Sequence, residues 1–478
     1  MSVINTNVTS LLAQNVLATN NSNLSTSLER LSTGLQINSG ADNPAGYIAV
    51  QSFNQENTGL TTALNNASLA GNVIGTAQGG LGQVSDLLTQ LQGLVGQAAN
   101  SGGVSSDQIQ ADQLQVNSIL NTINRIANGT NFQGIGLLNG NLSYVTSGVK
   151  SSALQNLQIN SAQLPDTGKL TVNVDLVTAA KQAEITSTTS SVSTATTLQI
   201  NGNLGSVELT FTANTKASAI ASEINGVSSE TGVTASAALS GTGIKNLSLI
   251  SSGYGASQFV SVTTSNTTGY NFAKASGTVT SGYGSDAVVT VNGTQANAQG
   301  NDVSYSTPSL DFQFDLATQL TAGSTETFGI TGGGANFAIG AQVNDAGVAS
   351  IGISSVSTAN LGDSTDGYLD SLATGGANEL SSSNLNTAQK IITAAINQVS
   401  SLSGRLGAFQ DYTIGSTVSA LNVAYENSSA AESAIADTNF ASETSNLTRA
   451  QILSQAATTV LAQANARPQQ ALTLLQNA

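Results

Sequence analysis

The chain contains no cysteine, no histidine and no tryptophan. Without cysteine there is no disulfide and no thiolate, and without histidine there is no imidazole to bind a metal ion or to act as a general base. Serine–histidine and cysteine–histidine catalysis are excluded on the same ground. Carboxylates, lysine and tyrosine remain, and no convergent set of them stands out. We therefore expect no enzyme, no cofactor and no metal site.

Charge is also scarce. Asp, Glu, Lys and Arg make up 8% of the chain, against about 25% in an average protein. The 27 acidic residues outnumber the 12 basic ones, for a net charge of -15, so the basic patches on which nucleic-acid binding depends are missing. A polar but nearly uncharged surface can pack against itself with little charge to desolvate. The composition excludes nucleic acid as a partner and permits close self-packing.

Long hydrophobic runs are missing as well. No segment reaches the roughly 18 apolar residues of a membrane-spanning helix. The N-terminal stretch MSVINTNVTSLLAQNVLATNN lacks the basic region and the unbroken apolar run of a signal peptide. We expect neither membrane insertion nor export by a cleaved signal peptide.

Apolar residues at alternating spacings of three and four predict helices at both ends of the chain. The N-terminal series is Leu24, Leu28, Leu31 and Leu35. The longest C-terminal series is Leu385, Ala388, Ile392, Ala395, Val399, Leu402, Leu406 and Phe409. A later series is Leu453, Ala457, Val460 and Ala464, and the chain closes on an apolar patch that contains Leu472 and Leu475. These side chains form either the core of an intrachain bundle or seams between subunits.

Two more helices are predicted between these ends. Residues 60–98 would span about 58 Å as one helix, and the clearest part of their apolar stripe is Leu81, Val84, Leu88, Leu91, Val95 and Ala98. The segment is rich in glycine, and each glycine costs about 1 kcal/mol relative to alanine. This helix therefore needs partners, which the glycines allow to come close. A further helix carries Val116, Leu120, Ile123 and Ala127.

The stretch SGADNPAGYIAV at residues 39–50 interrupts the first two helices. Gly40 and Pro44 stop a regular helix, and Asn43 is pushed out of the α region by the proline that follows it. Asp42 or Asn43 can cap a new helix that has Pro44 in its first turn. We expect a break with a cap, and no ligand at Asp42.

Between about residues 140 and 375 the apolar period changes to two, which predicts strands separated by turns. Residues 198–250 suggest a β-β-helix-β order, and the run TSTTSSVSTATT at 186–197 reads as a linker or domain entry. TGGG at 331–334 lacks the Lys-Ser/Thr of a phosphate-binding loop and is interpreted as a turn. The predicted fold class is mainly α, a coiled coil or helical bundle of paired N- and C-terminal segments, with β-rich insertion domains in the middle.

Both ends of the chain resemble bacterial flagellin, the subunit of the flagellar filament. The N-terminal residues that carry the resemblance are INTNVTSLLAQN, LERLSTGLQINSGADNPAGYIA and NRIANGTNFQGIGLLNG. The C-terminal ones are GRLGAFQ and ESAIADTNFASETSNLTRAQILSQAATTVLAQANARPQQALTLL. Residues 198–237 look like a repeat found in flagellins and hook proteins.

The resemblance implies a structural subunit that polymerises into the extracellular flagellar filament. It implies that residues 1–44 and 434–478 form an inner coiled-coil domain, that 45–184 and 331–433 form a helical core domain, and that 185–330 form variable surface domains. The break at 39–50 then connects two helical layers. The implied partners are further copies of the chain, the flagellar export apparatus, an export chaperone, the filament cap and the hook-associated proteins. A hook–filament junction protein or a secreted adhesin that displays the β-rich domains is the alternative.

Some positions depart from the flagellin pattern. Many flagellins carry Arg where this chain has Gln90 and Gln92, and Glu where it has Gly93. Leu94 is retained, and Asp112 replaces a Glu. These positions match the surface that a vertebrate innate receptor reads, so we expect weak recognition.

The few charges on the terminal helices are open to two interpretations. They belong either to a solvated face or to pairs that set the register between subunits. The residues are Arg30, Asp437, Glu443 and Arg449.

Overall fold

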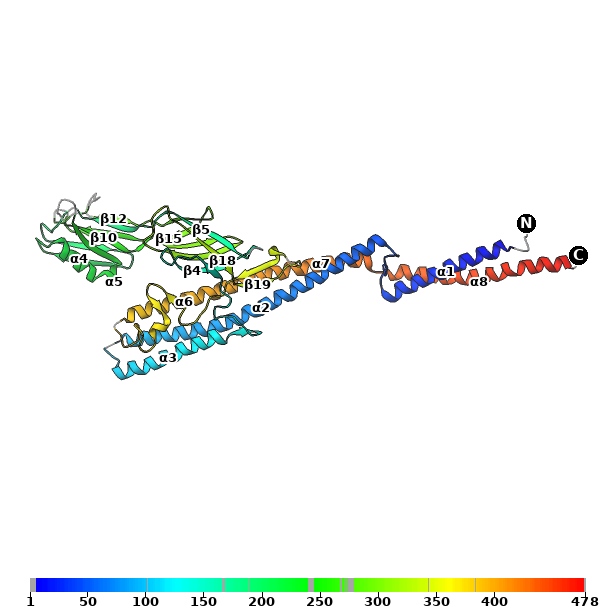
Figure 1. Cartoon of the computed structure of the whole chain (residues 1–478), viewed down its shortest axis with the longest axis horizontal. Helices are drawn as coiled ribbons and strands as arrows, with labels where there is room; N and C mark the ends of the chain where they lie inside the picture. The colour runs from blue at the N-terminus through cyan, green and yellow to red at the C-terminus, as the bar shows by residue number, and fades with distance from the viewer. Residues whose placement is uncertain are drawn as a thin grey trace. The chain divides into compact units, whose positions relative to one another are not determined.

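The structure is a computed structural model of the chain. It describes residues 6–100, 102–165, 168–187, 189–239, 245–266, 269–270, 272, 279–342, 344–382 and 384–476. The chain folds as two compact units, the first made of Met1–Leu69, Ala338–Gly347 and Thr413–Ala478, and the second of Ala70–Phe337 and Val348–Tyr412. Helices form both ends of the chain and strands its middle (Figure 1), so the predicted fold class is confirmed.

The first unit is helical. It contains α1 (Val8–Thr33), α7 (Ser416–Ala436), α8 (Phe440–Gln476) and the beginning of α2 (Pro44–Ala98). The side chain of Asn7 accepts a hydrogen bond from the Ser10 N–H at the start of α1, and Gly34 ends the helix with a φ of 77°. Only glycine adopts this left-handed conformation at little cost.

The break between α1 and α2 is a capped turn. Asp42 accepts hydrogen bonds from the hydroxyl and the N–H of Ser39, which hold the pKa of this carboxyl below its usual value. Asn43 accepts a hydrogen bond of 3.0 Å from the Gly46 N–H, and α2 begins at Pro44. The predicted cap and the predicted place of the proline are confirmed.

The helices of the second unit are the later part of α2, α3 (Ser106–Gly129) and α6 (Leu385–Ala408). They lie side by side in Figure 1. The stripe predicted at Leu81 extends backward without a change of spacing, through the buried Ala70, Ile74 and Ala77. Gly80 permits close contact here, because a Cβ atom at this residue would lie 2.7 Å from Leu138 and from the Thr130 hydroxyl. A π-helical segment, η3 (Phe409–Gly415), follows α6.

The first β-sandwich is built from two antiparallel sheets around one core. One sheet has the order β14 (Thr294–Gln295), β13 (Val288–Val291), β5 (Leu170–Thr178), β18 (Thr325–Gly332) and β3 (Val145–Ser147). The other has the order β15 (Asn297–Gln299), β16 (Asp302–Ser306), β17 (Leu310–Leu316) and β4 (Leu154–Ala162). Phe312 lies at the centre of the core, with ring centroids 5.5 Å from Phe314 and 5.8 Å from Phe328.

The second β-sandwich has its own core. One of its sheets has the order β6 (Gln182–Thr186), β10 (Lys245–Tyr254) and β9 (Val233–Leu239). The other has the order β12 (Val279–Tyr283), β11 (Phe259–Thr264), β7 (Thr196–Asn201) and β8 (Ser206–Phe211). Helix α4 (Ala217–Gly226) places Ile220 and Ile224 in this core, and the short α5 (Ser228–Thr231) follows it. The order β7, β8, α4, β9 is the β-β-helix-β pattern predicted for residues 198–250.

Short elements complete the chain. They are β1 (Asn131–Phe132), β2 (Ile135–Gly136), β19 (Ala335–Ala338), η1 (Asp345–Gly347), β20 (Val348–Ile351), β21 (Gly362–Asp363), β22 (Gly367–Tyr368) and η2 (Leu369–Leu372).

The two sandwiches do not coincide with the predicted surface domain of residues 185–330. The first core draws on residues 153–180 and 287–330, and the second on residues 183–272. The chain crosses between them at Lys181 and Ser285, whose backbones exchange N–H···O hydrogen bonds of 2.8 and 3.0 Å. Strands before and after the second sandwich pair with each other, an arrangement that local periodicity does not reveal.

Candidate functional site

Helices α1 and α8 of the first unit pack against each other in antiparallel orientation. Their direction follows from polar pairs in which the residue number on α8 falls as the number on α1 rises. These pairs are Ser10 with Asn465 at 2.7 Å, Asn21 with Ser454 at 2.8 Å, and Arg30 with Glu443 at 3.9 Å. The two ends of one chain therefore form a two-helix coiled coil.

The seam between these helices consists mainly of small and polar side chains. The buried residues of α1 are Ser10, Ala13, Asn20 and Ser27. On α8 the buried residues are Glu443, Ala450, Ala457 and Ala464. Small side chains let the two backbones come close, but they bury little apolar area, and burial contributes only about 25 cal/mol per Å². This pair of helices is therefore weakly stabilised by its own contact.

The leucine series predicted on α1 is divided between the two faces of the helix. Leu24 and Leu31 are half-buried in the seam, whereas Leu28 is 50% exposed, and Leu35, which follows the end of α1, is 37% exposed. The seam runs instead at Ser10, Ala13, Leu17, Asn20, Leu24, Ser27 and Leu31, which keep the spacing of three and four. Four of these seven positions hold a small or short polar residue, so the spacing of the leucines alone suggested a different register.

The series predicted on α8 is divided in the same way. Ala457 and Ala464 are buried in the seam, whereas Leu453 is 46% exposed and Val460 is 55% exposed. The side chains of Leu472 and Leu475 lie outside the described residues. Large apolar residues of α8 thus stay largely exposed beside α1.

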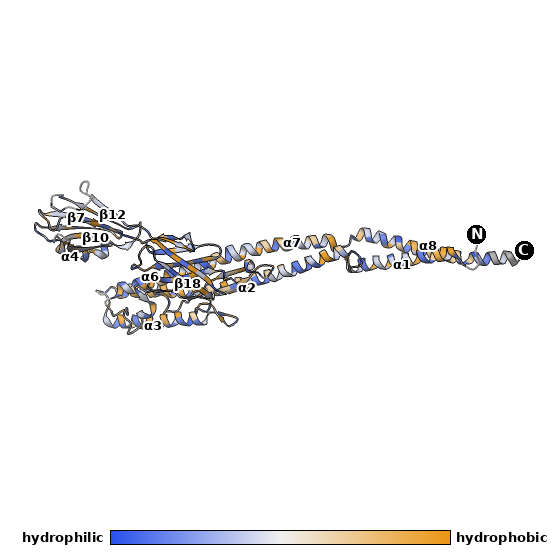
Figure 2. Ribbon diagram, turned by 45° about the horizontal axis from the view of Figure 1, so that its top comes forward, coloured by the Kyte–Doolittle hydropathy of each residue, from blue (hydrophilic) through white to orange (hydrophobic). Residues whose placement is uncertain are grey.

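An apolar groove lies along the outer side of the two helices. It has a volume of 450 Å³, and its apolar lining consists of Leu12, Ala13, Val16, Leu453, Ala456, Ala457, Val460 and Ala464. Val8, Leu11 and Leu12 are all more than half exposed. The hydropathy colours of α1 and α8 show apolar residues repeated along both helices (Figure 2). Apolar side chains exposed together in this way are typical of surfaces that contact another molecule.

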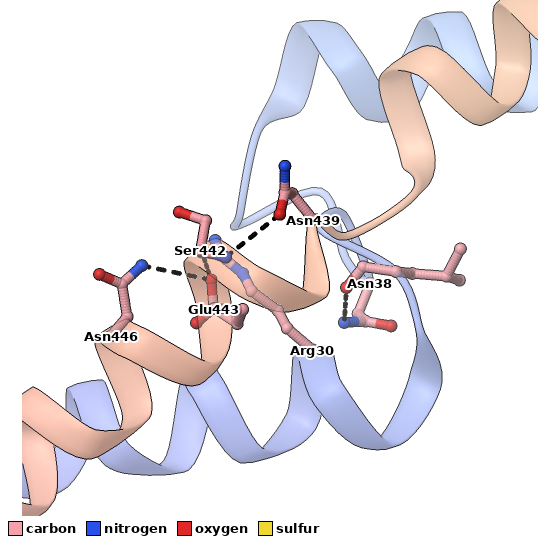
Figure 3. Close-up of polar contacts among 7 residues, drawn as sticks. Arg30, Asn38, Asn439, Ser442, Glu443 and Asn446 are labelled. Carbon is pink, nitrogen blue, oxygen red and sulfur yellow. Dashed lines mark hydrogen bonds and ion pairs between the residues drawn. The ribbon is translucent and has the colours of Figure 1, made fainter.

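An ion pair joins α1 to the first turn of α8 (Figure 3). The side chains of Arg30 and Glu443 are only 26% and 10% exposed. Asn446 donates a long hydrogen bond of 3.5 Å to Glu443, and the Ser442 N–H donates to the Asn439 side chain, which caps α8. Removing one partner would leave the other charge poorly solvated, so the pair favours one register of α1 against α8 within a single chain.

The other two charges predicted on the terminal helices lie apart from this pair. Asp437 accepts a hydrogen bond from the Ser433 hydroxyl, and Arg449 is exposed.

The series predicted on α6 faces the interior of the second unit. Ala388, Ile392, Ala395, Val399, Leu402 and Leu406 are at most 2% exposed, and Leu385 and Phe409 are half-buried. In the receptor region Gln90 is exposed and Gln92 and Leu94 are half-buried. Asp112 is only 5% exposed, and this burial was not evident from the sequence.

No cluster of three or more acidic side chains in the described part of the chain could hold a metal ion. Among the same residues, no helix is both long and apolar enough to cross a membrane.

Three family models match the chain. The bacterial flagellin N-terminal helical region matches residues 4–143, the flagellin hook IN motif matches 197–253, and the bacterial flagellin C-terminal helical region matches 389–475. The first and last of these contain α1 and most of α8.

Curated relatives match along the whole chain. A flagellin of Salmonella choleraesuis (strain SC-B67) is 30% identical over 517 residues, and one of Salmonella muenchen is 29% identical over 526 residues. Each alignment covers 99% of this chain and 99% of the relative. Among solved structures, the flagellar junction protein FlgL from Legionella pneumophila aligns with 81% of this chain and 99% of its own at 13% identity, with a TM-score of 0.28, which is too low to carry an argument. From the full-length match to the curated relatives and the family regions at both ends, the chain belongs to the bacterial flagellin family.

Proposed function

We propose that this flagellin assembles into its filament through the apolar side chains that α1 and α8 leave exposed. The chain is a structural subunit of the bacterial flagellum, and it acts in the extracellular filament that serves motility. The observation that supports this contact surface is the division of the two helices into a seam of small residues and an outer face of large apolar residues. The outer face gains burial only when another molecule covers it.

The groove and the exposed leucines that could fill the groove of a neighbouring copy lie on different faces of the α1–α8 pair. This arrangement favours a head-to-tail contact between copies. Leu28 of α1 and Leu35, just beyond the end of this helix, are exposed, yet neither lines the groove bounded by Leu12 and Val460. A contact between two different surfaces leaves one of them free at each end of the polymer, so copies add in an open helical series. In this proposal the segments 1–44 and 434–478 form the inner coiled coil of the filament.

The remaining partners follow from membership of the family. We propose that the subunit passes through the flagellar export apparatus, is held by an export chaperone before export, and meets the filament cap and the hook-associated proteins during assembly. The exposed apolar face of α1 and α8 is the surface that a chaperone would need to cover in the free subunit.

We expect the double variant Leu453→Asp with Val460→Asp to fold as a monomer and to fail to form filaments. Both side chains are exposed in the free chain, so the monomer loses little. In the filament each carboxylate would replace an apolar contact, and burying one large apolar side chain is worth about 1.5–3 kcal/mol. The concentration needed for assembly should therefore rise more than tenfold, as measured by sedimentation of polymer.

The matched control is Gln451→Asp with Thr458→Asp, which adds the same charge at the same seven-residue spacing to exposed polar positions of α8. It should assemble much closer to the unaltered chain. Equal assembly of the two double variants would show that the apolar face is not the contact.

We also expect weak activation of the vertebrate innate receptor that recognises many flagellins. Gln90, Gln92 and Gly93 cannot supply charge-assisted hydrogen bonds, and Asp112 is buried. A reporter-cell assay should give a smaller response than an Arg-bearing flagellin at equal monomer concentration. The double variant Gln90→Arg with Gln92→Arg should raise the response, and an unaltered chain as active as the Arg-bearing flagellin would contradict the prediction.

A further inference from the structure

The outer face of the sheet β15-β16-β17-β4 carries two rows of polar side chains. In register across the four strands, one row is Gln299, Asp302, Asp315 and Gln155, and the next is Asn297, Ser304, Gln313 and Gln158. The alternate residues Val303, Phe312 and Phe314 are buried in the sandwich core. A sheet face that meets a helix is ordinarily apolar, so these rows are unusual.

Helix α6 and the β21–β22 hairpin form the opposite wall. The Gln398 side chain holds the hairpin by donating to the Gly362 carbonyl at 2.6 Å and accepting from its N–H at 3.0 Å. The space between wall and sheet is a groove of 660 Å³ lined by residues such as Gln299, Gln313 and Asn397. These two hydrogen bonds fix the hairpin against α6, so the wall opposite the sheet is a single surface.

A second cavity of 650 Å³ continues the groove. The two share Asn156, Gln158 and Gln398, and the second adds the rings of Tyr144 and Tyr368. Each volume falls in the range of about 300–1,000 Å³ that is usual for small-molecule sites.

The lining determines which ligands fit. Neither cavity is lined by Lys or Arg, and Asp302, Asp315 and Asp363 line the first, so phosphate, sulfate and uronate groups would be repelled. Side-chain amides and carboxylates form hydrogen bonds with hydroxyl groups, and tyrosine rings offer flat apolar faces.

Asp302 lies directly opposite Asp315, and like charges in this position are unfavourable. Burial, followed by these neighbouring carboxylates, raises the pKa of Asp315. A ligand rich in hydroxyl donors would relieve this repulsion.

We propose that the groove between the sheet β15-β16-β17-β4 and helix α6 binds a neutral oligosaccharide. The amide rows of the sheet and Asn397 of the helix hold its hydroxyl groups, and Tyr144 and Tyr368 contact its ring faces at one end. This site is independent of the assembly surface on α1 and α8.

The test is calorimetric titration of the full-length monomer with maltotriose, cellotriose and tri-N-acetylchitotriose, with trigalacturonate as the acidic comparison. We expect at least one neutral trisaccharide to bind with a Kd of about 1 mM or below and trigalacturonate not to bind. The double variant Gln313→Ala with Asn397→Ala should weaken binding at least tenfold. The control Thr327→Ala, at an exposed position on the other sheet of the sandwich, should leave it unchanged.

Gln313 and Asn397 are exposed, so the variant should keep its melting temperature. If it does not, Gln299→Ala, at an exposed position in the same groove, replaces it with the same expected direction. The proposal is overturned if none of the three neutral trisaccharides binds, if the acidic one binds best, or if a folded groove variant binds as well as the control.

Discussion

A chain that lacks residues 182–284 and joins Lys181 to Ser285 through Asn-Gly is expected to fold and to form filaments without the mass of the second sandwich. Lys181 and Ser285 are a hydrogen-bonded antiparallel pair, and a two-residue turn of this composition closes such a pair. Among the residues of the deleted segment that the structure describes, none belongs to the buried core of the first sandwich. Of the same described residues, Tyr254 is the one partly buried apolar side chain that packs against this core.

The contrasting deletion, residues 185–330, should yield insoluble or unfolded protein. It removes Val289, Phe312 and Phe328 from the first core while leaving Val172 and Val174 without partners. Solubility, circular dichroism and electron microscopy of both shortened chains decide the question. Filaments from the longer deletion, or aggregation of the shorter one, would place the domain boundary elsewhere than Lys181 and Ser285.

Val399→Asp is expected to destabilise the helices of the second unit by several kcal/mol. Val399 is 1% exposed, and an unpaired carboxylate in such a place must be desolvated or must take up a proton. The melting transition of the helical part should fall sharply, as followed by circular dichroism. Ser400→Asp, at the next residue and exposed, adds the same charge and should change the transition little.

The destabilisation should depend on pH with a defined sign. Burial raises the pKa of the new carboxyl in the folded state above its value of about 3.9 in the unfolded chain. Below the unfolded-state pKa the carboxyl is protonated in both states, and as the pH rises toward the folded-state pKa the variant loses stability. The difference in stability between Val399→Asp and Ser400→Asp should therefore shrink as the pH falls toward about 4 and be smallest below that pH. Equal melting of the two variants at neutral pH would mean that residue 399 faces solvent.

The sequence by itself determined the class of each segment. The capped break at Asn43 and Pro44 follows from local backbone chemistry. The α6 stripe follows from a series of large apolar residues whose spacing admits one buried face. Lack of histidine and cysteine removed most catalytic chemistry without any structure. These properties depend on residues within a few positions of one another, so the order of residues is sufficient to predict them.

Tertiary structure alone decided which faces meet. On α1 and α8 the leucines Leu28 and Leu453 fit a heptad pattern but are exposed. The buried positions between the helices are instead held by residues such as Ala13, Asn20 and Ala457, because short side chains allow the two helices to come close. In the middle of the chain, β5 precedes the second sandwich in the sequence, yet it pairs with β13 and β18, which follow it. The first sandwich is therefore built from two separate segments, and the local pattern near residue 330 does not mark a domain boundary. The groove beside Gln313 and Asn397 likewise joins residues from distant segments. Pairing between remote segments depends on shape and burial in three dimensions, which local spacing does not encode.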